Sequence, residues 1–322
     1  MRWSPIAIAL LAGCSSAEAP HSAAPVRLHI LATADVGSDT DVCGCRIKRL
    51  GGLTRRAQVI EDRIRSFDGP TMVVDAGDLF FRRWSVPSRY QAQAKRRAQL
   101  HADALARWKV PAMAVGERDL AFGLRELRML ALRANVTLLS ANLAFISEDA
   151  HPFEAYVLVP VQGLMVGFVG ASARLPPGDP GQQAYEAAGL RALPEGPAVL
   201  AAAQAARRAG ADFIVGLLHI GEARAVELLE GLPEDTLDLA VVGHDRTIGG
   251  LQLAAGGRRG FVLGGERGKW LVAIEAQIRS GAQGVVDDDL LEKHRQQRRE
   301  LDQAIEKAQD PSRKERLVRR RS

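Results

Sequence analysis

The stretch that decides the fold runs from Met72 to Asp78 and reads MVVDAGD. Its first part is a short β-prone apolar run, and its end carries two carboxylates around a glycine. The regions on either side, 53–65 and 89–107, place apolar residues at helical spacing. A strand between two helices is the repeating unit of α/β proteins. The stretch therefore predicts a buried strand whose polar end is available for chemistry.

The same alternation continues outward along the chain. Strands are predicted at 27–33, 72–76, 112–115, 137–140, 155–159, 165–170, 213–218 and 239–242, with helices at 53–65, 89–107, 124–134 and 198–209. The runs 249–254, 260–264 and 269–278 are separated by glycine-rich turns and predict consecutive antiparallel strands. We expect an α/β (α+β) fold over residues 26–281, in the form of a four-layer sandwich of two mixed sheets flanked by helices.

Composition excludes several classes of protein. The 322 residues are 47% hydrophobic and 25% charged, as in an ordinary globular protein, which rules out a disordered, collagen-like or disulfide-stapled chain. The net charge of +5 is matched by residues 313–322 alone, which hold six basic residues and one acidic. We expect no nucleic-acid binding, because the excess charge lies in a terminal tail. Residues 287–309 predict a surface helix or short coiled coil, followed by a basic disordered tail at 310–322.

The first residues have the pattern of a bacterial export signal. Arg2 precedes an apolar run at 6–11, which is too short for a permanent membrane span. Leu11-Ala12-Gly13-Cys14 resembles a lipobox, in which the leader is cut before a cysteine that then carries acyl chains. We predict a leader at 1–13, lipidation of Cys14, a flexible tether at 14–25 and a lipid-anchored location in the cell envelope, on the outer membrane facing the periplasm. The alternative is a plain signal peptide with a coincidental cysteine.

Five predicted strands end in residues that commonly bind metals. These residues are Asp35, Asp78, Glu117, His219 and His244. Polar strand ends gather at one edge of an α/β sheet, where ligands bind. Mixed carboxylate and imidazole ligands suit Mn, Fe or Zn better than Mg or Ca. The bland alternatives are a hydrogen-bonded core histidine and, for an aspartate, a helix N-cap.

The order of these residues resembles the calcineurin-like metallophosphoesterases, in particular the catalytic domain of bacterial 5′-nucleotidases. That family has Asp-x-His, Gly-Asp, Gly-Asn-His-Glu/Asp, a lone His and Gly-His-x-His, in this order. The corresponding stretches here are Asp35-Val36-Gly37, Gly77-Asp78, Gly116-Glu117-Arg118-Asp119, His219 and Gly243-His244-Asp245-Arg246. GGLTRR at 51–56 and LSANL at 139–143 are also similar to the 5′-nucleotidase branch; Arg55 and Arg56 are expected on a solvated helix face. The resemblance covers roughly residues 26–280 and implies the metallophosphoesterase sandwich fold.

The resemblance implies a two-metal site of which one half is complete. In the family, two metals share the Gly-Asp carboxylate and clamp the phosphate. The first metal also uses two histidines whose positions are Gly37 and Arg246 here, so that only Asp35 and Asp78 remain. The ligands of the second metal correspond to Asp78, Glu117, His219 and His244. We therefore expect one divalent transition metal, Mn, Fe or Zn, and a second site that lacks two ligands.

Arg118 stands where the resembled family has a catalytic histidine that helps to protonate the leaving oxygen. An arginine cannot supply a proton near neutral pH. It can hold a phosphate or another oxyanion, and so can Arg246. Asp119 follows directly, and Arg118 and Asp119 can equally form a simple loop ion pair. The candidate catalytic residues are Arg118, Asp119 and Arg246.

A Cys-Gly-Cys element follows the first strand end. Cys43 and Cys45 lie eight and ten residues after Asp35. The element resembles a subgroup of exported 5′-nucleotidase-like lipoproteins. Three interpretations remain open: a strained disulfide or redox pair, thiolate ligands that replace the lost histidines of the first metal, or a structural pair. Spacing alone does not decide among them.

Two functions fit the sequence. One is an exported, lipid-anchored metallophosphoesterase similar to 5′-nucleotidases, which hydrolyses phosphate esters weakly if at all because its metal site is degenerate. The other is a non-catalytic metal-binding or thiol-redox module that acts with an envelope partner through Cys43 and Cys45. The expected partners are thus a membrane, a phosphate-ester ligand and an envelope redox protein. Only about 40 residues follow the predicted domain, so we expect no nucleoside-binding second domain.

Overall fold

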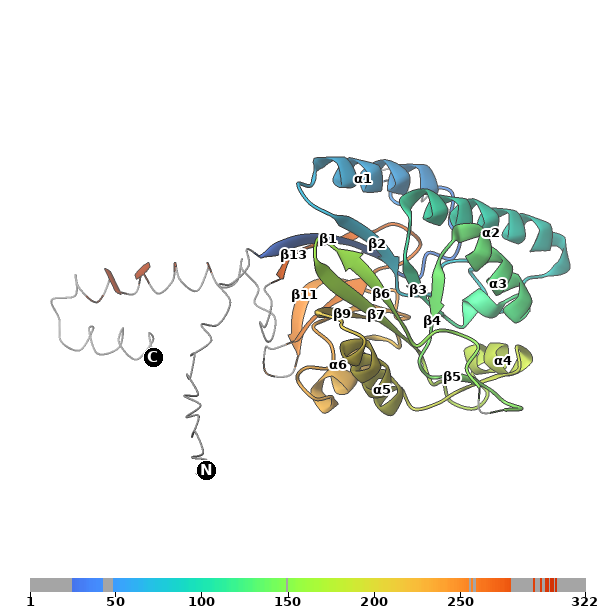
Figure 1. Ribbon diagram of the computed structural model, residues 1–322. Coiled ribbons are helices and arrows are strands. Elements are labelled where there is room, and N and C mark those ends of the chain that lie inside the picture. The colour runs from blue at the N-terminus through green and yellow to red at the C-terminus, as the bar shows by residue number, and fades with distance from the viewer. Residues whose placement is uncertain are drawn as a thin grey trace, which may run out of the picture.

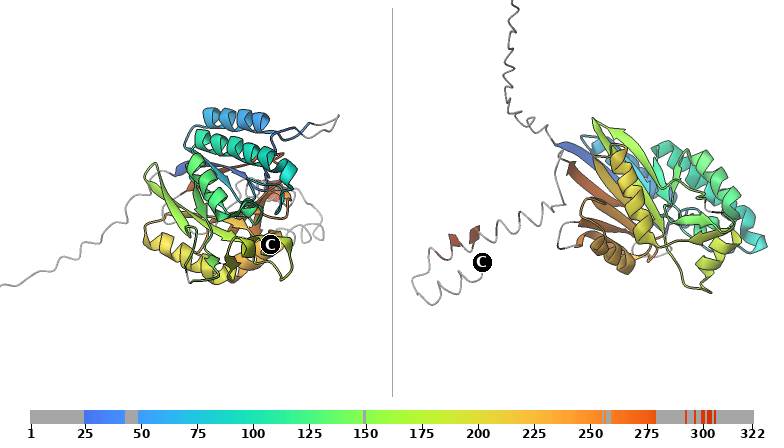
Figure 2. Two further views of the ribbon diagram at one scale, coloured as in Figure 1. Left: turned by 90° about the vertical axis from the view of Figure 1, so that its right-hand side faces the viewer. Right: turned by 60° about the horizontal axis from the view of Figure 1, so that its bottom comes forward.

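The computed structural model describes residues 25–42, 49–148, 150–254, 256 and 259–278, together with Glu292, Gln296, Arg299, Glu300, Asp302, Gln303 and Ile305. Two β-sheets lie face to face at the centre, and helices cover the outer face of each sheet (Figure 1). The views in Figure 2 show the same layers from two further sides. The predicted fold class, two mixed sheets flanked by helices, is confirmed.

The first sheet contains the strand that decides the fold. Its order is β13-β1-β2-β3-β4, with the bounds β1 (Val26–Thr33), β2 (Thr71–Asp75), β3 (Ala112–Ala114), β4 (Thr137–Leu139) and β13 (Val272–Ile278). β1 to β4 run parallel, whereas β13 pairs antiparallel with β1. The carboxyl ends of the parallel strands therefore lie at one edge.

The second sheet has the order β11-β12-β10-β9-β7-β6. Its strands are β6 (Tyr156–Val161), β7 (Leu164–Ser172), β9 (Phe213–His219), β10 (Leu239–Gly243), β11 (Ile248–Ala254) and β12 (Arg259–Gly264). The four central strands are parallel, and β6 and β11 are antiparallel edges. β5 (Leu143–Phe145) and β8 (Leu190–Ala192) form a small separate ladder.

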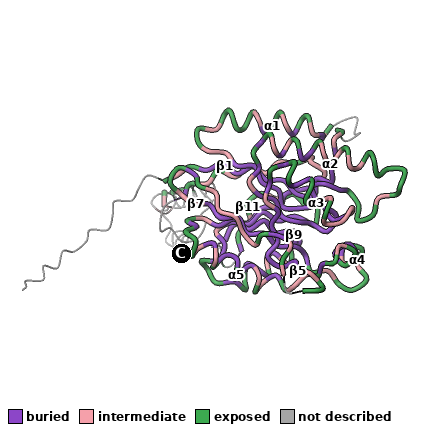
Figure 3. Tube along the Cα trace, turned by 45° about the vertical axis from the view of Figure 1, so that its right-hand side comes forward, coloured by how far each residue is buried: buried purple, intermediate pink, exposed green. Residues whose placement is uncertain are grey.

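Each outer layer of helices buries its apolar side on one sheet. α1 (Leu53–Ser66), α2 (Ser88–Trp108) and α3 (Gly123–Ala134) cover the first sheet, and α5 (Glu195–Arg208) and α6 (Glu222–Gly231) cover the second. α4 (Pro180–Ala187) contacts β8, and a 3₁₀ turn, η1, spans Arg118–Leu120. Most residues of the central strands are buried, and exposure is concentrated on the helices and loops (Figure 3).

The core follows the two-residue period of the strands. Leu31 and Val73 pack in the cluster under the helices, whereas Ile30 and Val74 pack between the sheets. Successive side chains of a strand point to opposite faces, so a strand covered on both faces is apolar throughout. This explains why β2 contains no polar residue between Thr71 and Asp75.

The end of the fold differs from the sequence prediction. β11 and β12 are antiparallel neighbours as expected, but β13 crosses to the first sheet and pairs with β1. There the alternate residues Val272, Ile274 and Ala276 pack against the apolar cluster between the sheets, which outweighs continuation of the local meander. The sequence patterns also missed α4, α6, β5 and β8.

The predicted leader, the predicted tether up to residue 24 and the basic tail lie outside the described residues, as do Cys14, Cys43 and Cys45. Within the described part of the chain, no helix combines the length and apolarity that crossing a membrane requires.

Candidate metal centre

The carboxyl ends of five parallel strands meet where the two sheets face each other. The loops after β1, β2 and β3 and the ends of β9 and β10 carry Asp35, Asp78, Glu117, His219 and His244. Backbone hydrogen bonds join the first two loops: the Asp35 N–H donates to Gly77 O at 2.9 Å and the Gly37 N–H to Asp78 O at 2.9 Å. The structure thus brings all five predicted ligand residues into one buried region.

Three of these residues have a backbone conformation that residues other than glycine rarely adopt. The φ angles are 52° at Asp35, 57° at Asp78 and 93° at His244. Residues other than glycine are uncommon at positive φ. Such conformations cost energy and persist where the surrounding structure holds them, most often at functional sites.

One half of the centre, which we call the arginine half, consists of Asp35, Asp78 and Arg118. The guanidinium donates from Nε to Asp78 Oδ2 and from Nη2 to Asp35 Oδ1. The Arg118 backbone N–H donates to the other Asp78 oxygen at 2.7 Å, and the His244 N–H donates to the other Asp35 oxygen at 2.8 Å. Arg118 is therefore bound inside the protein and does not point to solvent as a free oxyanion clamp.

The charges of the arginine half are mutually stabilised. Burial alone would lower the pKa of Arg118, but Asp78 and Asp35 raise it above its ordinary value, so the guanidinium stays charged. Burial raises the pKa of Asp35, with a further rise from Asp78 that Arg118 and His219 oppose. A buried carboxylate pair requires such a partner.

The other half, which we call the histidine half, consists of Glu117, His219 and His244. Glu117 Oε2 lies 3.0 Å from His219 Nε2 and 3.5 Å from His244 Nδ1, and His219 Nε2 lies 3.3 Å from Asp78 Oδ2. His219 Nδ1 donates to Ala76 O at 2.8 Å, because a carbonyl only accepts. That hydrogen bond fixes the imidazole and directs Nε2 to the carboxylates.

The histidine half carries strongly shifted pKa values. Burial alone would lower the pKa of His219, but the charges of Asp78 and Glu117 outweigh it and raise the pKa well above the usual value. Burial would raise the pKa of Glu117, yet His219 and His244 lower it well below its usual range. His219 and the two carboxylates thus each favour the charged form of the other.

The donor set of the histidine half fits a divalent transition metal. Neighbouring ligands of a tetrahedral zinc with bonds of 2.0–2.1 Å are about 3.4 Å apart, and the contacts above span 3.0 to 3.5 Å. His244 Nδ1 is buried and makes no hydrogen bond to a described residue. The His219 hydrogen bond to a backbone carbonyl is typical of metal-ligating histidines. Such an ion would be held by Glu117, His219 and His244, with Asp78 beside them.

The arginine half does not fit a second ion. Asp35, Asp78 and His219 offer atoms within 4.8 Å of one another, but the guanidinium of Arg118 is bound to the two carboxylates. Gly37 has no side chain, and a Cβ there would lie 3.3 Å from the Cα of Arg82. We therefore assign no metal to this half.

Two glycines make room for the central imidazole. A Cβ on Gly77 would lie 2.7 Å from His219 Nδ1, and one on Gly243 would lie 3.1 Å from the same atom. Real Cβ atoms essentially never approach another atom within 3.0 Å, so any side chain at Gly77 would displace His219. At Gly243 the nearest atoms are Ala76 O at 2.7 Å and Ala34 Cβ at 2.9 Å. Gly77 is thus required by a residue far from it in sequence, and Gly243 chiefly by the loops after β1 and β2.

Asp119 holds the loops of the centre in place. Its carboxylate accepts the backbone N–H groups of Asp78 at 2.9 Å, Phe80 at 2.8 Å and Gly116 at 3.1 Å. Burial and the nearby Asp78 raise its pKa to about 7, although the backbone donors oppose this rise. Both oxygens are used on the backbone, which makes Asp119 a positioning residue.

Arg246 is exposed, with φ at 59°, and makes no hydrogen bond or ion pair with a described residue. The structure therefore does not join this predicted catalytic residue to Arg118. Asn142 is buried and fully occupied: it donates to Ser172 O and Leu193 O and accepts from Ser172 N. It links chain segments next to the centre.

Sequence reasoning missed two aromatic residues at the centre. Trp84 donates from Nε1 to Glu117 Oε1 at 3.4 Å. Tyr185, on the unpredicted helix α4, is fully buried, and burial together with Glu117 and Asp78 raises its pKa well above the usual value. Neither residue follows a strand, so the strand-end criterion could not find them.

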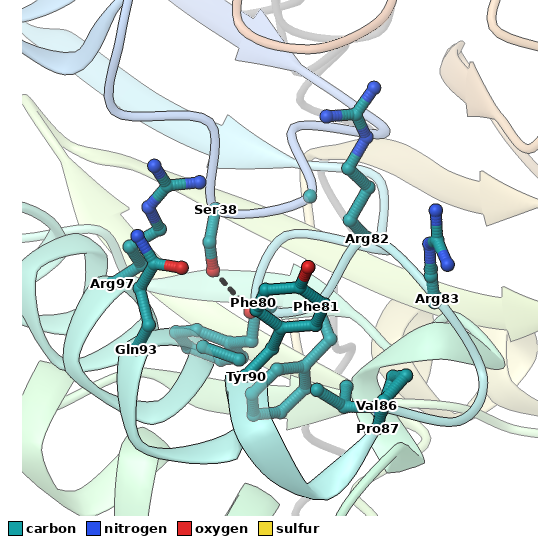
Figure 4. Close-up of a pocket in the computed structure, with 12 residues that line it drawn as sticks. Ser38, Phe80, Phe81, Arg82, Arg83, Val86, Pro87, Tyr90, Gln93 and Arg97 are labelled. Atoms are coloured by element: carbon teal, nitrogen blue, oxygen red, sulfur yellow. Dashed lines mark hydrogen bonds between the residues drawn. The ribbon is translucent and has the colours of Figure 1, made fainter.

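A cavity of about 290 Å³ lies beside the centre, between the loop after β2 and helix α2. Its floor contains Phe80, Phe81 and Tyr90, and the guanidinium groups of Arg82, Arg83 and Arg97 surround it (Figure 4). The loop that lines the cavity also carries Trp84, which contacts Glu117. The cavity and the metal centre thus lie on two sides of one loop.

Comparison with known proteins matches the fold. The chain is similar to a 5′-nucleotidase precursor from Thermus thermophilus (19% identity, TM-score 0.61, 79% of this chain and 55% of that chain). It is also similar to the sulfate thiohydrolase SoxB from the same organism (18%, 0.63, 81% and 55%) and to a calcineurin-like phosphoesterase from Bacillus subtilis (18%, 0.62, 81% and 91%). No family model matches the sequence, and no curated protein matches it.

These similarities establish the fold. The chain has the fold of the calcineurin-like metallophosphoesterases, as its strand-end motifs predict. It spans about half the length of the nucleotidase and SoxB structures, and nearly all of the Bacillus phosphoesterase.

Proposed function

We propose that this protein binds one divalent transition metal, Mn, Fe or Zn, in the histidine half and is a phosphate-ester hydrolase of low activity. The observation that carries the proposal is the contact of Glu117 Oε2 with both imidazoles at 3.0 and 3.5 Å; the His244 nitrogen in the longer contact is buried and makes no hydrogen bond to a described residue. The fold supports the reaction class, since solved structures of the same fold include 5′-nucleotidases.

The residues of the centre limit the chemistry. A bound metal would polarise a phosphoryl oxygen and lower the pKa of a water molecule. Arg118 cannot protonate a leaving oxygen, because it is charged and bound to Asp35 and Asp78. Loss of a general acid costs about 10²–10⁴-fold in rate. Turnover should therefore favour esters whose leaving group needs no proton, such as aryl phosphates.

The arginine-lined cavity would hold the organic part of the ester. Arg83 makes no ion pair with a described residue, whereas Arg97 is 2.9 Å from Asp41. An aromatic floor beneath guanidinium groups suits an anionic or aromatic substituent. Arg83→Ala should raise KM for an anionic aryl ester and leave kcat near the wild-type value.

The test combines metal analysis with two substrates. Purified protein should contain about one transition metal per chain, and His219→Ala should lose it. 4-Nitrophenyl phosphate should be hydrolysed slowly, with AMP hydrolysed more slowly still. Robust AMP hydrolysis would overturn the low-activity proposal, and two tight metals retained in the double variant His219→Ala/His244→Ala would overturn the metal assignment.

A second candidate is a non-catalytic or thiol-redox module that acts with an envelope partner. The hydrogen bonds of Arg118 to Asp35 and Asp78 favour this second function, because the two carboxylates are then not available to a first metal. Alkylation of Cys43 and Cys45 that requires reduction, irrespective of chelator, would support this function. Protection that disappears with chelator alone would instead indicate thiolate ligation to a metal.

The proposed location is the cell envelope, with Cys14 as the lipid anchor. Cys14→Ser should leave the chain uncleaved or release it from the membrane fraction. A cleaved form that remains in that fraction would contradict lipidation. Several acyl chains are needed for stable anchoring, since one binds only marginally.

A further inference from the structure

The arginine half departs from a metal site in a specific way. The Arg118 side chain is 4% exposed, and the two carboxylates bound to it are completely buried. A guanidinium in such a place is a desolvated cation held by opposite charges, as a metal ion would be. It lies between the two aspartates that the sequence motifs align with first-metal ligands.

We propose that the guanidinium of Arg118 is a permanent, protein-supplied cation in place of a first metal ion, so that the centre accepts one ion instead of two. The proposal goes beyond the proposed function, because it concerns Asp35 and Asp78 and holds whether or not an ester is hydrolysed.

Every carboxylate oxygen of the arginine half already accepts a hydrogen bond. Arg118 uses both oxygens of Asp78, one through Nε and one through its backbone N–H. Asp35 accepts from Arg118 Nη2 on one oxygen and from the His244 N–H on the other. An ion bound between these aspartates would have to displace a charged donor from a buried position.

The residues that would complete a first-metal site are absent around the guanidinium. Gly37 contributes no side chain, and the Cα of Arg82 lies close to where its Cβ would be, at 3.3 Å. Arg246, at the other lost histidine position, is exposed. Asp78 Oδ2 remains 3.3 Å from His219 Nε2, so that the same carboxylate still faces the histidine half.

Charge balance leads to the same stoichiometry. The carboxylates that contact Arg118, those of Asp35, Asp78 and Glu117, bring three negative charges, and Arg118 neutralises one. The Asp119 carboxylate is held instead by three backbone N–H groups. One divalent ion beside neutral histidines balances the other two. Removal of the guanidinium would leave a net negative pocket with room for another cation.

The experiment measures bound Mn²⁺ per chain, by equilibrium dialysis and elemental mass spectrometry, in wild type and five variants. Wild type and Arg118→Lys should bind about one ion. Arg118→Ala should bind about two, and Arg118→Ala/His244→Ala about one. Arg133→Ala, which removes an arginine from the surface pair with Asp103, is the matched control and should bind as wild type does.

Thermal unfolding with and without Mn²⁺ supplies the second readout. Arg118→Ala should unfold at a lower temperature than wild type. Mn²⁺ should raise the unfolding temperature of this variant more than that of Arg118→Lys. Any of three results would overturn the proposal: two ions in wild type, an unchanged ion count in Arg118→Ala, or an Arg118→Ala chain that stays unfolded in Mn²⁺. The His244→Ala single variant tests the proposed function separately. An ion retained in this variant would contradict the assignment of the metal to the histidine half and would leave the proposal on Arg118 unaffected.

Discussion

The arginine half and the histidine half lie within hydrogen-bonding distance of each other, and both contact Asp78. The buried carboxylates are compensated in different ways in the two halves. In the arginine half, every carboxylate oxygen is matched by a donor of the protein. In the histidine half, a buried ring nitrogen has no hydrogen-bond partner among the described residues. A buried ring nitrogen without a hydrogen bond, beside carboxylates, thus distinguishes the half that can take an ion from the half that is already filled.

The largest expected effect comes from breaking the arginine half. Arg118→Ala leaves two buried carboxylates without their cation, which typically costs about 3–5 kcal/mol of unfolding free energy. Arg133→Ala removes the exposed pair with Asp103 and should cost at most about 1 kcal/mol. Urea denaturation of both variants measures the difference. Equal losses would show that Arg118 is not a structural cation.

The next effect concerns the histidine half. His219→Ala removes the imidazole that contacts both Glu117 and Asp78. We expect Mn²⁺ affinity to fall by at least about a hundredfold, equivalent to about 2.7 kcal/mol, as measured by calorimetry. His151→Ala is the control, because His151 binds the carbonyl of Leu143 away from the centre. Unchanged affinity in His219→Ala would place the ion elsewhere.

A separate, pH-dependent effect comes from Asp75, at the end of β2. Burial raises its pKa to about 8, although hydrogen bonds from Thr33 and the Gly77 N–H oppose the rise. The unfolded chain loses this proton near pH 4 and the folded chain near pH 8, so this group makes the protein less stable as pH rises between those values.

Asp75→Asn removes that titration. The slope of unfolding free energy against pH should change by up to about 1.4 kcal/mol per pH unit between pH 4 and 8, with the variant less sensitive to rising pH than wild type. Denaturation at several pH values measures the slope. Parallel curves for the two proteins would mean that Asp75 is ionised in the fold.

The smallest effect should follow from Arg246, the exposed residue that belongs to neither half. Arg246→Asn tolerates the positive φ and should change unfolding free energy by no more than about 0.5 kcal/mol. Mn²⁺ stoichiometry should stay the same. A changed ion count would show that Arg246 does contribute to the centre.

The sequence predicted the location of the centre better than its internal contacts. Strand ends are readable because apolar runs stop at polar residues, and the structure brings Asp35, Asp78 and His219 together as that pattern predicts. The direction of a long side chain is not readable in this way. Arg118 was expected to be available for an oxyanion, but it is bound to Asp35 and Asp78.

Arg56 illustrates the same limit. A helical pattern of charged residues predicts solvent exposure, yet Arg56 is 5% exposed and bonds His101 Nδ1 at 2.8 Å. Helix α1 turns this residue towards α2, where its guanidinium lies over the Trp108 ring, 5.6 Å from the centroid. The course of β13 was also unreadable, because its partner β1 lies more than 200 residues earlier.

The uneven exposure of the candidate ligands has a consequence for exchange kinetics. The His244 side chain is 26% exposed, whereas those of Asp78, Glu117 and His219 are at most 3% exposed. Among these side chains only that of His244 reaches solvent, so an ion should enter and leave on that side, and its loading and release should be slow even where equilibrium favours them. The metal found in a purified sample would therefore record the ion supplied during biosynthesis more faithfully than the ion in the final buffer.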